Sequence, residues 1–261
     1  MLSMEQPVGH IMPSAPQNAI IAACLISIAI ALIYAIILAA RQRDNKLLVI
    51  LFASAAGISL EAFACYLIKC YYPEVNNIEA YTAFGIHVPL YLALMYLIVF
   101  GLFAFFFEAR FSQSPSPALF WGGFAFVSIS EGLFEIYATH VGLLSYWGAQ
   151  GVMIGGFPAH LGFVNPSLAL GFTAYMALGL RLLNGGARWL LVPLAVPFMV
   201  GFYAAMVMPA AAGLYTQDVG LAMFGQAVTV VLALALSTIS LRVLAYCSAP
   251  RSRAGAESPA F

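Results

Sequence analysis

The chain has 261 residues, of which 63% are hydrophobic and only 8% are charged, and its formal net charge is zero. This composition excludes an ordinary soluble domain, in which about a quarter of the residues are charged. Neither a basic stripe nor a phosphate-binding glycine motif is present, so nucleic acid and nucleotides are not expected as partners. The sequence predicts an all-α integral membrane protein.

Hydrophobic runs long enough to cross a hydrocarbon layer of about 30 Å recur along the whole chain. The first run lacks a preceding basic segment and is longer than the core of a secretory signal, so we expect it to be retained. Tails at 1–17, outside, and 247–261, in the cytoplasm, leave no room for a soluble domain. The predicted transmembrane domain, 18–246, holds seven helices at 18–40, 47–69, 86–108, 118–139, 158–183, 189–213 and 219–246.

Positive charge decides the expected orientation, because cytoplasmic loops collect Lys and Arg. Only Lys69 lies toward the opposite side, so we expect the N-terminus outside and the C-terminus in the cytoplasm, in a bacterial inner membrane. The remaining basic residues share the cytoplasmic side: Arg41, Arg43, Lys46, Arg110, Arg181, Arg188, Arg242, Arg251 and Arg253.

Most other ionisable side chains in or beside the spans fall in the outer half. If the bundle holds a polar cavity, it therefore opens near that half. In chain order these polar side chains are Glu61, His87, Glu131, Glu135, His140, His160, Asn165 and Asp218.

The segments 47–108 and 118–183 resemble each other, which suggests a duplicated helix pair with both copies in the same orientation. Glu61 is followed 28 residues later by Pro89, and Glu131 is followed 27 residues later by Pro158. In each segment an acid-bearing helix is followed by a loop and then by Pro and His at the next helix. Similar apolar composition alone also explains such a likeness.

Glu131 and Glu135 are one helical turn apart and share a face. Two ionised carboxylates are costly in hydrocarbon, so a shared proton or a bound cation is expected there. An acid inside a membrane is by default a functional candidate. The alternative is structural: one Glu bonds a neighbouring helix and the other reaches the interface.

Glu61 stands in "AAGISLEAFACYL" with no other charge, and it is either a functional acid or a structural hydrogen-bond partner. Asp218 precedes the last span, where an acid also serves as a helix N-cap. His87 and His160 begin spans near Pro residues, as substrate contacts or as solvated interface residues. His140 is expected at the interface.

Aromatic side chains are abundant, and most suit lipid belts and helix packing. An aromatic wall beside an acid also suits a reaction through a carbocation, because π faces stabilise positive charge and exclude water. The glycine-rich loop 148–156 is either a lid or a linker. The aromatic side chains expected near the acids are Tyr66, Tyr137, Tyr146 and Trp147, with His87, His160 and Asn165 as further substrate contacts.

The sequence resembles the small polytopic membrane cyclases: the seven-helix meroterpenoid terpene cyclases of fungi, the membrane lycopene cyclases and carotenoid hydratases, and AveC-type spirocyclases. The resemblance rests on "LEAFACYLIKCYYP" around Glu61, on Asp218 late in the chain and on "EGLFEIYATHVGLLSYWG". It implies that Glu61 and Asp218 form an acid and base pair. It further implies an apolar isoprenoid or polyketide-like substrate that is cyclised, isomerised or hydrated.

Two other classes stay open. A ceramidase-like, metal-dependent lipid hydrolase would use histidines and acids to bind zinc, but no HxxxH stands in the last span. A proton-coupled transporter or lipid-binding protein would use the unpaired acids as a relay. A retinal pump is disfavoured because the last span has no lysine.

The four cysteines show no metal spacing and predict no disulfide framework. They are Cys24, Cys65, Cys70 and Cys247. Neither a cofactor nor a metal is expected.

Overall fold

The structure is a computed structural model, and it describes residues 6–216 and 218–249. Arg251 and Arg253, and the outermost parts of the two predicted tails, lie outside these residues. Seven helices in the described chain are long and apolar enough to cross a membrane, which confirms the predicted helical class. They are Ser14–Gln42, Lys46–Ile68, Leu90–Gln113, Pro117–Val141, Leu161–Leu182, Gly185–Thr216 and Val219–Ser248.

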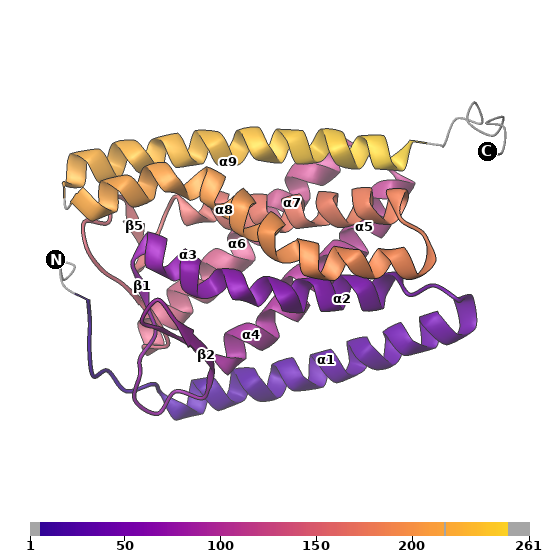
Figure 1. Cartoon of the computed structure of the whole chain (residues 1–261). Coiled ribbons are helices and arrows are strands. Elements are labelled where there is room, and N and C mark those ends of the chain that lie inside the picture. The colour runs from indigo at the N-terminus through magenta and orange to yellow at the C-terminus, as the bar shows by residue number, and fades with distance from the viewer. Residues whose placement is uncertain (1–5, 217, 250–261) are drawn as a thin grey trace.

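The helices run back and forth between two ends of an elongated bundle (Figure 1). Helix α1 (Ser14–Gln42) lies along the bottom of the view and α9 (Val219–Ser248) along the top. We call the end that carries the short strands the hairpin end. The opposite end, with the turns at 43–45 and 114–116 and the helical turn η3 (Gly185–Leu190), is the loop end.

The bundle is held together by close helix packing around α7 (Leu161–Leu182), whose Phe172 is fully buried. Helices α8 (Leu191–Thr216) and α9 approach so closely that a Cβ on Gly225 would lie 2.1 Å from the Pro209 carbonyl oxygen. Small residues permit this approach, as in many membrane helix pairs. Ser167 and Ser237 add a 2.8 Å hydrogen bond between α7 and α9.

Three pairs of short strands occupy the hairpin end, and the sequence patterns predicted none of them. β1 (Cys70–Tyr71) pairs antiparallel with β4 (Ser145–Tyr146). Two hairpins complete this end: β2 (Glu79–Ala83) with β3 (Ile86–Pro89), and β5 (Met153–Ile154) with β6 (Phe157–Pro158).

The strands correct two predicted helix boundaries. The third span begins at Leu90 and the fifth at Leu161, rather than at 86 and 158, because the residues before them pair as β3 and β6. The glycine-rich loop holds the β5–β6 turn, where Gly155 and Gly156 have φ values of +57° and +90°. Glycine adopts that conformation without steric cost.

The two predicted repeat segments share an order of elements: an acid-bearing helix, a two-residue strand, a hairpin that ends in proline, and another helix. The contacts favour a different register from the sequence spacing. Glu61 accepts a hydrogen bond from Tyr72 and Glu135 from Tyr146, and each tyrosine lies 11 residues after its acid. By contact, therefore, Glu135 rather than Glu131 is the counterpart of Glu61.

Two membrane-length helices are irregular along their length. The second consists of α2 (Lys46–Ala56), a 3₁₀ turn η1 (Gly57–Leu60) and α3 (Glu61–Ile68). The third consists of α4 (Leu90–Tyr96), a π-helical turn η2 (Leu97–Leu102) and α5 (Phe103–Gln113). Such turns inside long helices often mark functional positions. These two flank Glu61 and Tyr96, which are hydrogen-bonded to each other.

Candidate active site

A cleft of about 720 Å³ lies between the third spanning helix and α6 (Pro117–Val141). Its walls are almost entirely aliphatic and aromatic, and its few polar groups belong to Tyr96, Ser130, Glu131 and Glu135. The volume is in the range of small-molecule sites, which are mostly apolar with a few placed polar groups. The apolar lining is Leu92, Met95, Ile98, Val99, Phe100, Leu102, Phe103, Phe106, Phe107, Phe126, Val127 and Phe134.

The cleft adjoins a small polar chamber of about 90 Å³. Leu92, Tyr96, Phe100, Glu131 and Glu135 line both spaces, so the two are contiguous. The chamber brings together three acids from two helices, and an apolar cleft thus ends at a group of carboxyls. Its remaining polar lining is Glu61, Cys65, Cys70, Tyr72, Tyr146, Asn165 and Tyr203.

Glu61 is held entirely by hydrogen-bond donors. Its Oε1 accepts from the Tyr72 hydroxyl at 2.7 Å and from the Cys65 thiol at 3.0 Å. Its Oε2 accepts from the Tyr96 hydroxyl at 2.8 Å. A carboxyl that only accepts is suited to stabilising positive charge or to taking up a proton.

The acids of α6 are less tightly held. Glu135 Oε2 accepts from the Tyr146 hydroxyl at 2.9 Å. Asn165 interacts with the Glu131 side chain, but Glu131 Oε2 is buried and has no hydrogen-bond partner among the described residues. Buried polar atoms are normally paired, so an orphaned oxygen on a cavity wall is a place where a ligand atom can bind.

No Lys, Arg or His is among the described residues that line the cleft and the chamber. The acids are surrounded instead by tyrosine hydroxyls, thiols and one amide. Burial raises the pKa of the Tyr72 and Tyr146 hydroxyls, which lie outside the spanning segments, well above the usual value. Both therefore remain protonated donors. This polar set can hold and transfer protons without a permanent counter-charge.

Tyr81 of the β2–β3 hairpin explains why the helix changes at Glu61. Its hydroxyl donates to the Ile58 carbonyl at 2.8 Å and accepts from the Ala62 amide at 3.2 Å. In a continuous α-helix these two backbone groups would bond each other. The hydroxyl is thus inserted between a carbonyl and an amide that would otherwise form an α-helical hydrogen bond. The Glu61 amide donates to the Ile58 carbonyl instead, which is the 3₁₀ pattern. Tyr81 is a positioning residue for Glu61.

The hairpin end of the chamber is closed by the β1–β4 pair and the residues around it. Cys70, Tyr72 and Tyr146 line the chamber and are at most 5% exposed. Leu143 and Leu144 beside β4 are also buried. The large opening is therefore the cleft between the helices.

Five of the predicted site residues meet at this chamber: Glu61, Glu131, Glu135, Tyr146 and Asn165. Asp218 does not. Its carboxylate is exposed and caps α9 by accepting from the Leu221 amide at 3.0 Å, as the capping alternative predicted. The acid and base pair of Glu61 and Asp218 implied by the resemblance is thus not brought together.

The other predicted contacts also lie outside the two cavities. Tyr66 and Tyr137 are 46% and 47% exposed on the bundle surface. The ring of Trp147 packs on the Lys69 ammonium, 4.7 Å away. His87 bonds Glu79 on the β2–β3 hairpin.

His160 is buried beside the start of α7, and neither ring nitrogen has a hydrogen-bond partner among the described residues. Burial lowers the pKa of His160 to about 4, so its ring is neutral at pH 7. His140 is exposed near the end of α6, as expected of an interface residue.

Sequence reasoning missed five members of the chamber: Cys65, Cys70, Tyr72, Tyr96 and Tyr203. One signal was available, namely the shared spacing of 11 residues between an acid and its tyrosine donor. Tyr96 and Tyr203 come from other helices, and only the packing of the bundle brings them to Glu61.

Within residues 6–216 and 218–249, no three His, Cys, Asp or Glu side chains are grouped as metal ligands would be. All four cysteines are free thiols. In comparisons with known proteins, no family model, no curated protein and no solved structure matches the chain.

Proposed function

We propose that the protein is a membrane-embedded enzyme that uses carboxylic acid and carboxylate chemistry to cyclise, isomerise or hydrate an apolar isoprenoid or polyketide-like substrate. One observation carries the proposal: a large apolar cleft adjoins a chamber lined by three carboxyls, and one of their oxygens has no hydrogen-bond partner among the described residues. The cleft suits the apolar body of a substrate, and the acids suit its reactive end. The proposal keeps the reaction class that the resemblance to membrane cyclases implies, but not the pairing of Glu61 with Asp218.

The contacts suggest a division of roles. Glu131, with its unpartnered oxygen on the cavity wall, donates a proton to a double bond or an oxygen of the substrate. Glu61, fixed by three donors, stabilises the cation that forms, assisted by the rings of Phe100 and Tyr96. Glu135 removes a proton after the new bond has closed. The proton then returns to Glu131, one helical turn away.

We further propose that the hairpin end faces the outside and the loop end faces the cytoplasm. The loop end carries Arg41, Arg110, Arg181 and Arg188 on helix ends and turns. Within the described chain, Lys69 is the one Lys or Arg of the hairpin end, and it is buried and donates to the Leu214 carbonyl. This asymmetry supports a multi-pass protein with its N-terminus outside. We place it in a bacterial inner membrane as part of the same proposal.

The test compares lipid extracts of cells that express the native protein, Glu131→Gln or Glu79→Gln at matched levels. Glutamine keeps the size of the side chain and removes its exchangeable acid proton. Glu79→Gln is the matched control, because Glu79 lies on the exterior β2–β3 hairpin. We expect mass spectrometry to find an apolar product with the native protein and the control but not with Glu131→Gln. A product that Glu131→Gln forms undiminished would refute the proposal.

A host without the substrate gives no product with any variant. Extracts from the source cells are therefore added to purified native protein in liposomes, and the consumption of each apolar component is followed. Consumption that depends on Glu131 supports the enzyme. If no component is consumed while protons cross the liposome membrane with the native protein, the acids serve transport instead.

A further inference from the structure

The way into the chamber is a window in the side of the bundle, between α5 and α6. At the loop end of the window the Phe107 ring of α5 packs against Phe120, and a Cβ on Gly123 of α6 would lie 2.3 Å from that ring. At its hairpin end the Tyr91 hydroxyl of α4 donates to the Leu143 carbonyl at 3.3 Å. The third spanning helix is thus joined to α6 at the loop end and to Leu143, just after α6, at the hairpin end, and the cleft lies between these contacts.

The rim of the window is apolar and faces outward. Phe106 of α5 and Phe126 of α6 both line the cleft, and they are 58% and 64% exposed on the bundle surface. Both stand within helices of membrane-crossing length. Glu131 lies ten residues before the end of α6 at Val141, which is about 15 Å along the helix axis. In a bilayer the window would therefore open into hydrocarbon rather than into water.

The opposite side of the chamber is covered. The β1–β4 pair places Cys70 and Tyr146 over it, and Leu143 and Leu144 are buried beside them. The described residues thus leave the acids open toward the apolar cleft and covered toward the hairpin end. Water in such a site is scarce, and a cation that forms there meets aromatic rings instead.

From this arrangement we infer that the substrate is a bilayer-dissolved molecule with a long apolar chain and a proton-accepting group at one end. It enters sideways between α5 and α6. Its reaction is an internal rearrangement in which no water is added. This inference rests on the proposed function and narrows it from three reaction types to cyclisation or isomerisation.

The balance of the step is simple. The proton of Glu131 forms a bond to carbon or oxygen of the substrate, and an electron pair of the same molecule closes on the resulting cation. A neighbouring carboxylate then takes one proton from the adjacent carbon. One proton is given and one is taken, so the product has the mass of the substrate.

Access is tested with purified protein in phosphatidylcholine liposomes that contain a palmitic acid analogue with a diazirine near the chain end. After illumination, labelled peptides are mapped by mass spectrometry. Ser130→Trp places a large ring in the window, and Ser130 is exposed, so the fold should tolerate the change. Ile129→Trp is the matched control, because Ile129 is 62% exposed on the same helix and does not line the cleft.

We expect label on α5 and α6 in the native protein and in Ile129→Trp, and a loss of about tenfold in Ser130→Trp. Equal labelling of all three proteins would overturn access through the window. Product formation, measured after extract from the source cells has been added to the same liposomes, gives a separate answer. A product heavier by one water would overturn the dry rearrangement, and label without any product would refute the proposed function while leaving the window in place.

Discussion

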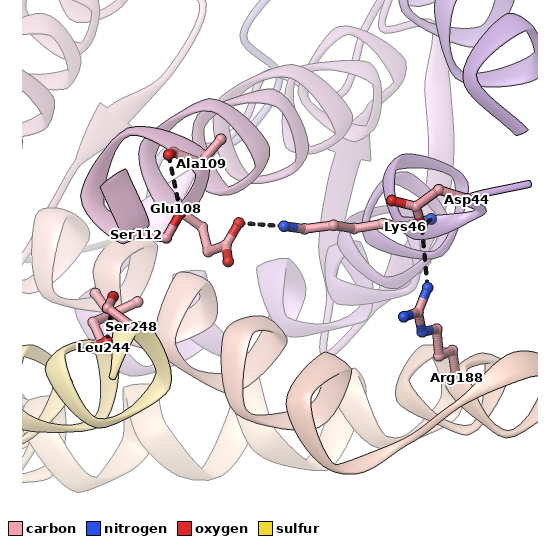
Figure 2. A network of polar contacts seen from close by, with 8 residues as sticks. All are labelled: Asp44, Lys46, Glu108, Ala109, Ser112, Arg188, Leu244 and Ser248. Carbon is pink, nitrogen blue, oxygen red and sulfur yellow. Dashed lines mark hydrogen bonds and ion pairs between the residues drawn. The ribbon is translucent and has the colours of Figure 1, made fainter. Parts of the chain in front are cut away.

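The loop end of the bundle and the chamber hold their acids in opposite ways. At the loop end every acid in view is paired with a base: Glu108 of α5 with Lys46 of α2, and Asp44 with Arg188 at 3.0 Å (Figure 2). In the chamber three acids come together, and they accept hydrogen bonds from tyrosine hydroxyls and a thiol, with an amide beside Glu131. The same side chain therefore serves two different purposes in one protein.

The difference has a physical basis. An ion pair fixes the charge of its acid and joins two segments, so its use is structural. Neutral donors leave an acid able to gain or lose a proton, at the cost of stability in an apolar environment. No Lys or Arg among the described residues of the chamber fixes its acids in the charged form. That arrangement is typical of sites where protonation is part of the function.

The strongest test of this contrast removes one carboxylate from the chamber and, separately, one from the loop end. Glu61→Gln should lower product formation about 10²–10³-fold, because the cation loses its fixed counter-charge. Glu108→Gln should leave product formation unchanged and lower the free energy of unfolding by about 1–3 kcal/mol, because Lys46 loses its partner. Product is measured by mass spectrometry and stability by thermal melting in detergent. If Glu108→Gln lowered product formation and Glu61→Gln lowered only stability, the roles assigned to these two acids would be exchanged.

A second test acts on Glu61 through the helix break. Tyr81→Phe removes the hydroxyl between the Ile58 carbonyl and the Ala62 amide. The Ile58 carbonyl keeps its bond from the Glu61 amide, but leaving the buried Ala62 amide unpaired should cost about 1–3 kcal/mol of stability.

The Tyr81→Phe change should also lower the rate of product formation about tenfold and shift its pH profile, because Glu61 moves relative to Tyr96. Tyr137→Phe, on the exposed surface of α6, is the matched control. A loss of stability with an unchanged pH profile would make Tyr81 merely structural.

The number and class of the helices followed from hydrophobic length alone, because crossing a bilayer demands about 20 apolar residues. The strands were missed for an equally physical reason. β1 and β4 have two residues each, and their pairing joins Cys70 to Tyr146 across 76 positions of the chain. No local pattern encodes such a contact. The hairpins β2–β3 and β5–β6 are also too short to show clear alternation.

The acids of the chamber were predictable because an isolated charge in an apolar helix is rare and expensive. Their tyrosine partners were not, since 13 tyrosines are spread over the chain and composition does not distinguish Tyr96 or Tyr203 from lipid-facing rings. Asp218 is an acid that the sequence suggested as a site residue, but it lies outside the chamber. An acid before a helix satisfies the helix N-terminus, and that local role accounts for its position without any site.

A smaller effect is expected at the second ion pair of the loop end. Arg188→Ala should lower the free energy of unfolding by less than about 1 kcal/mol, because Asp44 keeps 47% exposure and remains solvated without its partner. Product formation should not change. Thermal melting of this variant beside Glu108→Gln ranks the two ion pairs by their contribution to stability. A larger loss of stability for Arg188→Ala than for Glu108→Gln would contradict the prediction that the more buried pair contributes more.

The smallest expected effect lies on the β2–β3 hairpin, where Glu79 is an acid with a histidine partner outside the spans. Partial burial by itself would raise the pKa of Glu79, but hydrogen bonds with Thr82 and His87 outweigh it and hold the pKa below the usual value.

The folded pKa of Glu79 is thus depressed, so its contribution to stability is present above the unfolded value of about 4.3 and is lost as the pH falls through the folded value. Glu79→Gln should therefore lower the free energy of unfolding at pH 7 by about 0.2–0.5 kcal/mol, which thermal melting detects as a slightly lower midpoint. The difference from the native protein should vanish near pH 3. A gap that widened toward acid pH would show that Glu79 does not act as a carboxylate in the hairpin. Such a result would leave the ion pairs of the loop end and the neutral donors of the chamber as the two ways in which this protein holds an acid.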